Sequence, residues 1–136
     1  MSTEEARSVA HRIGVFPDPA WDGSEEEDGV LVVELSWPPD ALAGRPPELV
    51  ARPELVTVMA AASLTGYRTG AARGEYGEGA FDVEEGATPP PLVRLIVGDD
   101  PAADFSYREA EGLTVTERTL ILLQAQCQNL TVEPSV

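Results

Sequence analysis

The stretch Gly29-Val30-Leu31-Val32-Val33-Glu34-Leu35-Ser36-Trp37 is the clearest signal of regular structure in this chain. It is short, rich in β-branched residues and apolar at nearly every position of its first half, which is typical of a strand buried on both faces. Pro38 and Pro39 end it, because proline cannot donate to a strand ladder. We therefore predict a central strand of a sheet over residues 29–37.

A second strand is predicted over residues 92–97, which read Leu-Val-Arg-Leu-Ile-Val between a run of three prolines and a Gly-Asp-Asp-Pro turn. Residues 113–116 alternate as a third strand would. Thr114 and Glu117 also have the spacing of a capping box, which would instead begin a helix here. Residues 102–111 show no clear pattern.

Two segments in the middle and at the end of the chain fit a helix or a strand. Over residues 53–65, a proline at the first position and apolar residues at helical spacing indicate a helix; residues 56–58 also fit a strand, and three consecutive alanines favour the helix. Residues 119–130 fit both periods, and their length together with their Gln and Ala content favours a helix.

The remaining segments are assigned from their caps, charges, prolines and glycines. Residues 2–16 are expected to form a helix with Thr3 as its N-cap. Residues 18–28 carry an acidic run without apolar period and are expected to be a solvated loop. Five prolines in residues 38–53 predict a rigid connector with short helical turns, and six glycines in residues 66–86 predict a flexible hairpin or lid.

Together these elements predict a small single α+β domain, with an antiparallel or mixed sheet and two or three helices; an all-β sandwich is the alternative. We expect residues 1–28 to form an N-terminal helix and an acidic loop, partly flexible. Residues 29–136 would form the globular α+β domain, with the Gly-rich loop at 66–86.

The charge balance limits the partners. There are 24 Asp and Glu residues against 9 Arg and no Lys, so the net charge is −15. Such a field opposes binding to nucleic acid and to anionic membranes, and it attracts a basic protein surface. Acidity that only keeps the domain soluble is the simpler alternative. No apolar run is long enough for a membrane span and no signal peptide is seen, so a cytoplasmic location is expected.

The reactive side chains give little support for catalysis. His11 and Cys127 are the only histidine and the only cysteine, which is too few for a zinc site or a nucleophile with its base. We therefore predict no catalytic residues, no metal and no cofactor. Two acidic groups are interpreted as solvated surface, ahead of weak calcium or magnesium binding or catalysis. They are Asp82, Glu84 and Glu85, and Asp99, Asp100 and Asp104.

The Gly-x-Gly pair at 77–79 is not interpreted as a nucleotide loop, because acidic neighbours would repel phosphate. We instead expect the Gly-rich segment to offer aromatic and guanidinium anchors to a protein partner, namely Tyr67, Arg68, Arg73 and Tyr76. A small-ligand pocket lined by Trp37, Phe81 and Phe105 is a weaker hypothesis.

Residues 93–101, Val-Arg-Leu-Ile-Val-Gly-Asp-Asp-Pro, resemble a stretch of the head-to-tail connector proteins of tailed phages. This resemblance implies a structural component of a phage particle, and in that family several helices follow the stretch. It covers nine of 136 residues, and we do not adopt it as an assignment.

The functional expectation is therefore a non-enzymatic acidic protein that acts through protein partners or self-association, for example as a structural subunit of a larger particle such as a phage virion. One alternative is an inhibitor or immunity-type protein that masks a basic partner. Another is an enzyme that depends on carboxylates or a divalent ion.

Overall fold

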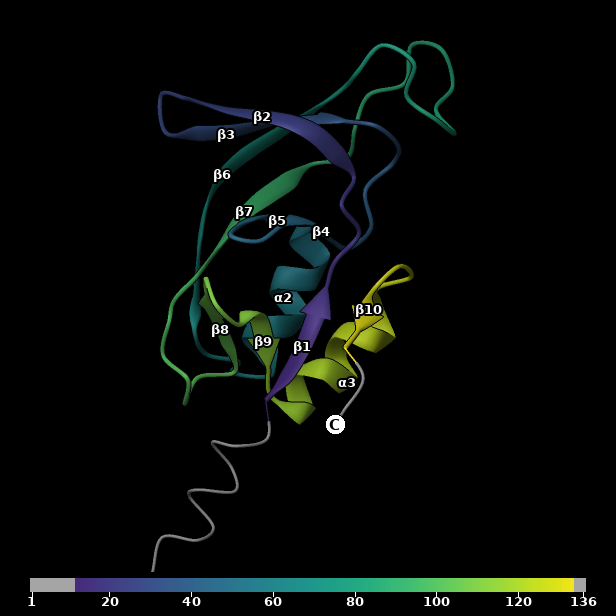
Figure 1. Ribbon diagram of the computed structural model, residues 1–136. Coiled ribbons are helices and arrows are strands. Elements are labelled where there is room, and N and C mark those ends of the chain that lie inside the picture. Colours follow the sequence, from purple (N-terminus) through teal and green to yellow (C-terminus); the bar gives the residue numbers. More distant parts are fainter. Residues whose placement is uncertain (1–11, 134–136) are drawn as a thin grey trace, which may run out of the picture.

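The computed structural model describes residues 12–133, which form two sheets and two helices and are mostly β with some helix (Figure 1). The smaller sheet is antiparallel with the order β10-β1-β9-β8. The larger sheet is mixed, with the order β2-β3-β6-β7-β5-β4 and one parallel pair, β3 with β6. The elements are β1 (Ile13–Phe16), β2 (Trp21–Glu27), β3 (Val30–Leu35), β4 (Leu42–Arg45), β5 (Glu48–Ala51), α2 (Pro53–Ala61), β6 (Tyr67–Tyr76), β7 (Leu92–Val97), β8 (Phe105–Arg108), β9 (Gly112–Val115), α3 (Glu117–Gln126) and β10 (Thr131–Val132).

The two strongest strand predictions are confirmed as β3 and β7. β3 has a partner on each side, β2 and β6, so it lies inside the sheet as expected. Leu31, Val33 and Leu35 are at most 1% exposed on one of its faces, and Val32 is buried on the other. Burial on both faces explains why this stretch is nearly continuously apolar.

The six-stranded sheet rolls until its two edges approach each other. Asp18, just before β2, forms a parallel bridge with Ala43 of β4, and the Gly44 N–H donates to the Asp18 carbonyl at 2.8 Å. The inside of this roll is filled by a hydrophobic cluster that includes Trp21 and Val50. The roll therefore supplies one of the two hydrophobic cores found in residues 12–133.

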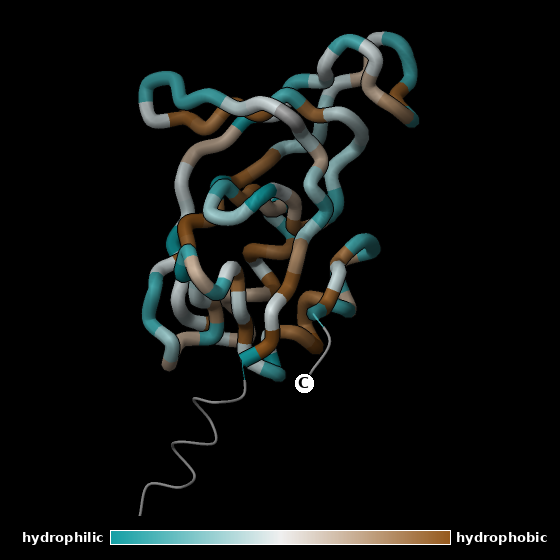
Figure 2. Tube along the Cα trace, viewed as in Figure 1, coloured by the Kyte–Doolittle hydropathy of each residue, from teal (hydrophilic) through white to brown (hydrophobic). Residues whose placement is uncertain are grey.

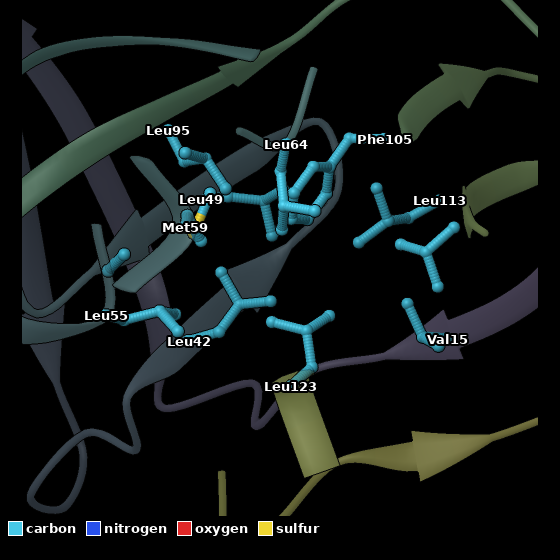
Figure 3. Packing of buried hydrophobic residues seen from close by; sticks show 12 residues of the cluster. Val15, Leu42, Leu49, Leu55, Met59, Leu64, Leu95, Phe105, Leu113 and Leu123 are labelled. Carbon is cyan, nitrogen blue, oxygen red and sulfur yellow. The ribbon is translucent and has the colours of Figure 1, made fainter. Parts of the chain in front are cut away.

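The second core lies between the roll, the small sheet and both helices. Figure 3 shows side chains from these elements pointing toward one another, among them Val15, Leu55, Phe105 and Leu123. Each of the four is at most 1% exposed. Burial of such a side chain contributes about 1.5–3 kcal/mol, so this cluster is the main attachment between the small sheet and the roll.

The predicted N-terminal helix is wrong where the structure can test it. Residues 1–11 lie outside the described residues, and Ile13–Phe16 form β1, which pairs with β9 and β10. Val15 is 1% exposed, so tertiary burial outweighs the helical spacing here.

The predicted acidic loop at 18–28 is also mostly wrong, because Trp21–Glu27 form β2. Asp28 and Gly29 have φ values of 50° and 81° and join β2 to β3 as a two-residue hairpin turn. The Asp-Gly pair before an apolar run is the signal that the sequence interpretation missed.

The proline-rich connector at 38–53 contains a second hairpin. β4 and β5 pair from Leu42 with Ala51 to Arg45 with Glu48, and the prolines Pro46 and Pro47 form the turn, with a cis bond between them. The prediction of a rigid connector with short helical turns is therefore wrong for residues 42–51, because the prolines lie at the turn and outside the ladder.

Both helix predictions that competed with strands are confirmed, as α2 and α3. α2 begins at Pro53, as the pattern indicates, and α3 is followed by the short strand β10. The capping box at Thr114 is wrong, because Thr114 pairs within β9 and Thr116 is the N-cap residue of α3. The strand alternative for residues 113–116 is the one observed, apart from Thr116.

The Gly-rich segment at 66–86 is not a lid over its first half. Tyr67–Tyr76 form β6, which has β3 on one side and β7 on the other. Gly74 faces the inside of the roll, where an added Cβ would lie 2.8 Å from Cδ1 of Leu35 and 3.1 Å from Cδ1 of Leu92. At this position glycine provides room for the core.

Candidate functional site

The four predicted partner-binding residues all lie on β6, but the structure does not bring them together. Tyr67 and Tyr76 are the two ends of this ten-residue strand, about 30 Å apart at the usual rise. The Tyr67 ring packs edge-on against Phe105 with ring centroids 5.6 Å apart, and Tyr76 packs against the core of the roll. Arg68 and Arg73 are exposed. A role of these four in partner binding stays a prediction.

Arg73 lies among acidic side chains on the outer surface of the roll. The strand register places Glu25 beside Val32 and Val32 beside Arg73; the next row is Gly23, Glu34 and Glu75. The Arg73 Nη2 donates to the Glu75 Oε2 at 3.2 Å, and both side chains are more than half exposed. We call this surface the acidic face; it consists of Glu25, Glu27, Glu34, Arg73 and Glu75.

The carboxylates of the acidic face are close enough to affect one another. A hydrogen bond with Glu27 raises the pKa of Glu25, and repulsion from the charges of Glu27 and Glu75 raises it further, while Arg73 opposes the effect. The raised pKa of Glu25 reflects the crowding of negative charge on this face. A cation brought to this face would relieve that repulsion.

A hollow of about 190 Å³ opens in the acidic face. Carboxylates of Glu25, Glu34 and Glu75 surround it, and Val32 lies among its lining residues. The hollow exists because Gly23 carries no side chain: a Cβ added there would meet nothing within 4 Å. A rim of carboxylates around an apolar residue suits the aliphatic stem and charged head of Lys or Arg.

The two acidic groups singled out from the sequence have different environments. Asp82 lies in the loop after β6 with φ of 57°, and Glu84 and Glu85 are exposed. Asp99 and Asp100 are exposed, whereas Asp104 is 6% exposed. Within residues 12–133, no three His, Cys, Asp or Glu side chains are arranged to hold a metal ion.

Asp104 is a structural carboxylate. It accepts hydrogen bonds from Arg118, Thr116 and Thr65 at 2.7–3.2 Å. The bond with Arg118, aided by those with the two threonines, holds the pKa of Asp104 well below its usual range although burial opposes this. The Arg118 guanidinium also donates to the carbonyls of Ala62 and Ser63, so the group ties α3 to the end of α2.

Neither the Cys127 thiol nor the predicted aromatic residues form a reactive or ligand-binding site in the part of the chain that the structure describes. Burial, followed by the nearby Asp40 carboxylate, raises the pKa of Cys127 to about 11, and His11 lies outside the described residues. Trp37 donates its Nε1–H to Asp18 at 2.9 Å. Phe81 is 69% exposed and Phe105 is fully buried in the other core, so these aromatic residues line no common pocket.

Two further hollows combine segments that are distant in the sequence, which is why the sequence did not indicate them. The first, about 410 Å³, lies between the start of α2 and the end of α3 and is lined by polar residues, among them Arg52 and Gln128. The second, about 390 Å³, is lined by Phe16 and three prolines, Pro17, Pro19 and Pro46, together with polar neighbours. Phe16 is 55% exposed, so this second hollow is open and partly apolar.

In the part of the chain that the structure describes, neither helix has the length and apolar character needed to cross a membrane. Comparisons of this chain with protein-family models, with curated proteins and with solved structures found no match.

Proposed function

We propose that this chain is a non-enzymatic acidic interaction subunit that recognises a basic surface of a protein partner through the acidic face. The observation that carries the proposal is the crowding of exposed carboxylates on one face, where Glu25, Glu34 and Glu75 line the hollow above Gly23 and Glu27 lies on the same face of β2. Complementary charge accelerates association and selects partners of opposite sign. The net charge of −15 adds a long-range field of the same sign.

Two narrower versions of this proposal use the same face. In one, the partner is a neighbouring subunit of a larger assembly, such as a virion. In the other, the partner is a protein with a cationic active site that this chain masks. Both predict association that weakens as salt rises.

An enzyme that uses carboxylates is the alternative from another class. A raised pKa is what a general acid needs, and Glu25 has one. Glu25 is, however, exposed, so water screens its charge and surrounds any substrate there. This difference in environment is why we place the interaction function first.

The test compares two triple variants of equal net charge. The first removes charge from the acidic face, with Glu25→Gln, Glu27→Gln and Glu75→Gln. The control removes three exposed charges elsewhere, with Glu54→Gln, Asp99→Asn and Glu109→Gln. Binding of a fluorescent heptalysine peptide is measured by anisotropy in about 0.05 M and about 0.5 M NaCl.

We expect the acidic-face variant to lose roughly fivefold or more of its affinity relative to the control at low salt, with the difference vanishing at high salt. An equal loss in both variants would mean that only net charge matters, and it would overturn the proposal.

A further inference from the structure

β2 lies at one edge of the six-stranded sheet, and within residues 12–133 no backbone hydrogen bond reaches the outer side of its residues 23–27. Its ladder with β3 begins at the two-residue turn, where Glu27 and Val30 form a hydrogen-bonded pair. Hydrogen-bonded and non-hydrogen-bonded pairs alternate along an antiparallel ladder, so Ser24 and Glu26 direct their N–H and C=O groups away from β3. The same alternation turns the Leu35 carbonyl toward β6, where it accepts a bond from the Gly77 N–H at 3.0 Å.

This edge is accessible and held in position. Residues 23–29 are all exposed, and in Figure 1 the tip of the β2–β3 hairpin projects away from the helices. In Figure 2 the same tip is hydrophilic. On the inner side, Ser24 Oγ donates to Glu48 at 2.6 Å and Arg94 donates to Glu26 at 3.1 Å, so side chains from β5 and β7 fix the strand. A strand fixed in this way loses little entropy when it binds a partner.

We propose that the β2 edge binds an extended basic segment of a protein partner by antiparallel strand addition along residues 23–27. Two residues of the added strand would exchange backbone hydrogen bonds with Ser24 and Glu26. The residues between and beside these two would lie over Glu25, Glu27 and the hollow above Gly23. Those positions are expected to be Lys or Arg. The inference rests on the proposed function and specifies how its partner binds.

The charges on β2 select this occupant over a second copy of the chain. Pairing β2 with another β2 would bring Glu25 and Glu27 beside glutamates of the same strand, and like charges in opposite positions destabilise a sheet. Lysine or arginine at those positions reverses the sign of the interaction. The apolar contact with Val32 in the hollow accommodates the methylene stem of one such residue.

The test uses the peptide Lys-Val-Lys-Val-Lys-Val-Lys in three forms of equal charge. The first is unmodified, the second is methylated at the backbone nitrogens of its three valines, and the third is methylated at the backbone nitrogens of its second, third and fourth lysines. If valines lie opposite Ser24 and Glu26, their N–H groups face β2, whereas the lysine N–H groups point away. Binding to the full chain is measured by fluorescence anisotropy at low salt.

We expect methylation of the valines to weaken binding by roughly tenfold or more, and methylation of the lysines to change it less than about threefold. Equal binding of all three peptides would overturn strand addition, although the acidic-face variants could still weaken binding and uphold the proposed function. Loss only with the lysine-methylated peptide would overturn the antiparallel alignment.

A pair of protein variants gives an independent measurement. Ser24→Pro and Ser24→Ala both remove the hydroxyl bond to Glu48 and keep the charge, but only proline removes the outward N–H. We expect Ser24→Pro to lose roughly tenfold in affinity for the unmodified peptide and Ser24→Ala to keep it. Equal affinity of two folded variants would contradict the proposal; if the proline variant does not fold, the methylated peptides decide.

Discussion

Replacement of Asp104 by Asn should destabilise the fold by about 2–3 kcal/mol at neutral pH. Asp104 accepts five hydrogen bonds from three residues, Thr65, Thr116 and Arg118, with its side chain 8% exposed. Loss of one side of a buried ion pair costs about 3–5 kcal/mol. The Arg118 side chain is 57% exposed and can be hydrated after the change, which lowers the cost. Urea unfolding followed by tryptophan fluorescence measures the difference.

The effect should depend on pH in a defined direction. Contacts with Arg118 first, and with Thr116 and Thr65, hold the pKa of Asp104 well below its usual range. The stabilisation is therefore complete above about pH 4, the pKa of Asp in an unfolded chain, and it is lost as the pH falls below that value. The difference in stability between the wild type and the Asp104→Asn variant should therefore narrow steadily as the pH falls from about 4 to about 2.

Two results would refute this account of Asp104. One is a stability at pH 7 within about 0.5 kcal/mol of the wild type, which is typical of an exposed surface change. The other is a constant difference in stability from pH 7 to pH 2. Asp99→Asn is the control, because Asp99 is exposed and should show neither the loss nor the narrowing.

Three further outcomes follow from packing and burial. Gly44→Ala should destabilise by roughly 2–4 kcal/mol in urea unfolding, because φ is +130° and the new Cβ would overlap the Trp21 ring; retained stability would contradict the closed roll. Cys127, with its pKa raised to about 11, should react with a thiol reagent at pH 8 about tenfold more slowly in the folded than in the urea-unfolded chain; equal rates would contradict its burial. Phe81→Ser should change the free energy of unfolding by less than about 0.5 kcal/mol, whereas Phe105→Ala should cost about 3–5 kcal/mol; similar values would refute the assignment of the core.

Local sequence patterns correctly predicted the elements whose own run of apolar residues matches a strand or a helix. The run at 29–37 and the run at 92–97 became β3 and β7, and Pro53 began a helix as expected. The failures are segments whose structure depends on a partner. Trp21–Glu27 carry an acidic run that has no apolar period, yet they form a strand because β3 supplies the ladder and Trp21 enters the core of the roll. No window of the sequence contains both halves of that interaction.

For the candidate site, likewise, composition indicated the charge, whereas the arrangement of the residues could be known only from the structure. Composition indicated a negative surface field, from which a basic protein partner was proposed. The same analysis directed attention to aromatic and arginine residues of β6 that lie apart in the structure. The hollow could not be predicted, because it depends on Gly23 lying one row from Glu25, and on both lying beside β3. Acidic residues became a surface with a defined geometry only once the strand register was known.

The acidic edge of β2 has two physical explanations that make opposite predictions for a basic strand. Consecutive glutamates on an edge strand protect a sheet against pairing with itself, and protection alone requires no particular arrangement on either face. On β2 the glutamates are divided: Glu26 accepts a hydrogen bond from Arg94 on the inner side, whereas Glu25 and Glu27 lie on the acidic face, where Glu25 borders the Gly23 hollow. Protection from self-pairing would be served as well by a side chain at residue 23 that filled the hollow. Gly23→Leu should therefore leave folding intact and weaken binding of the basic peptide, whereas unchanged binding would identify the acidic edge as protective only.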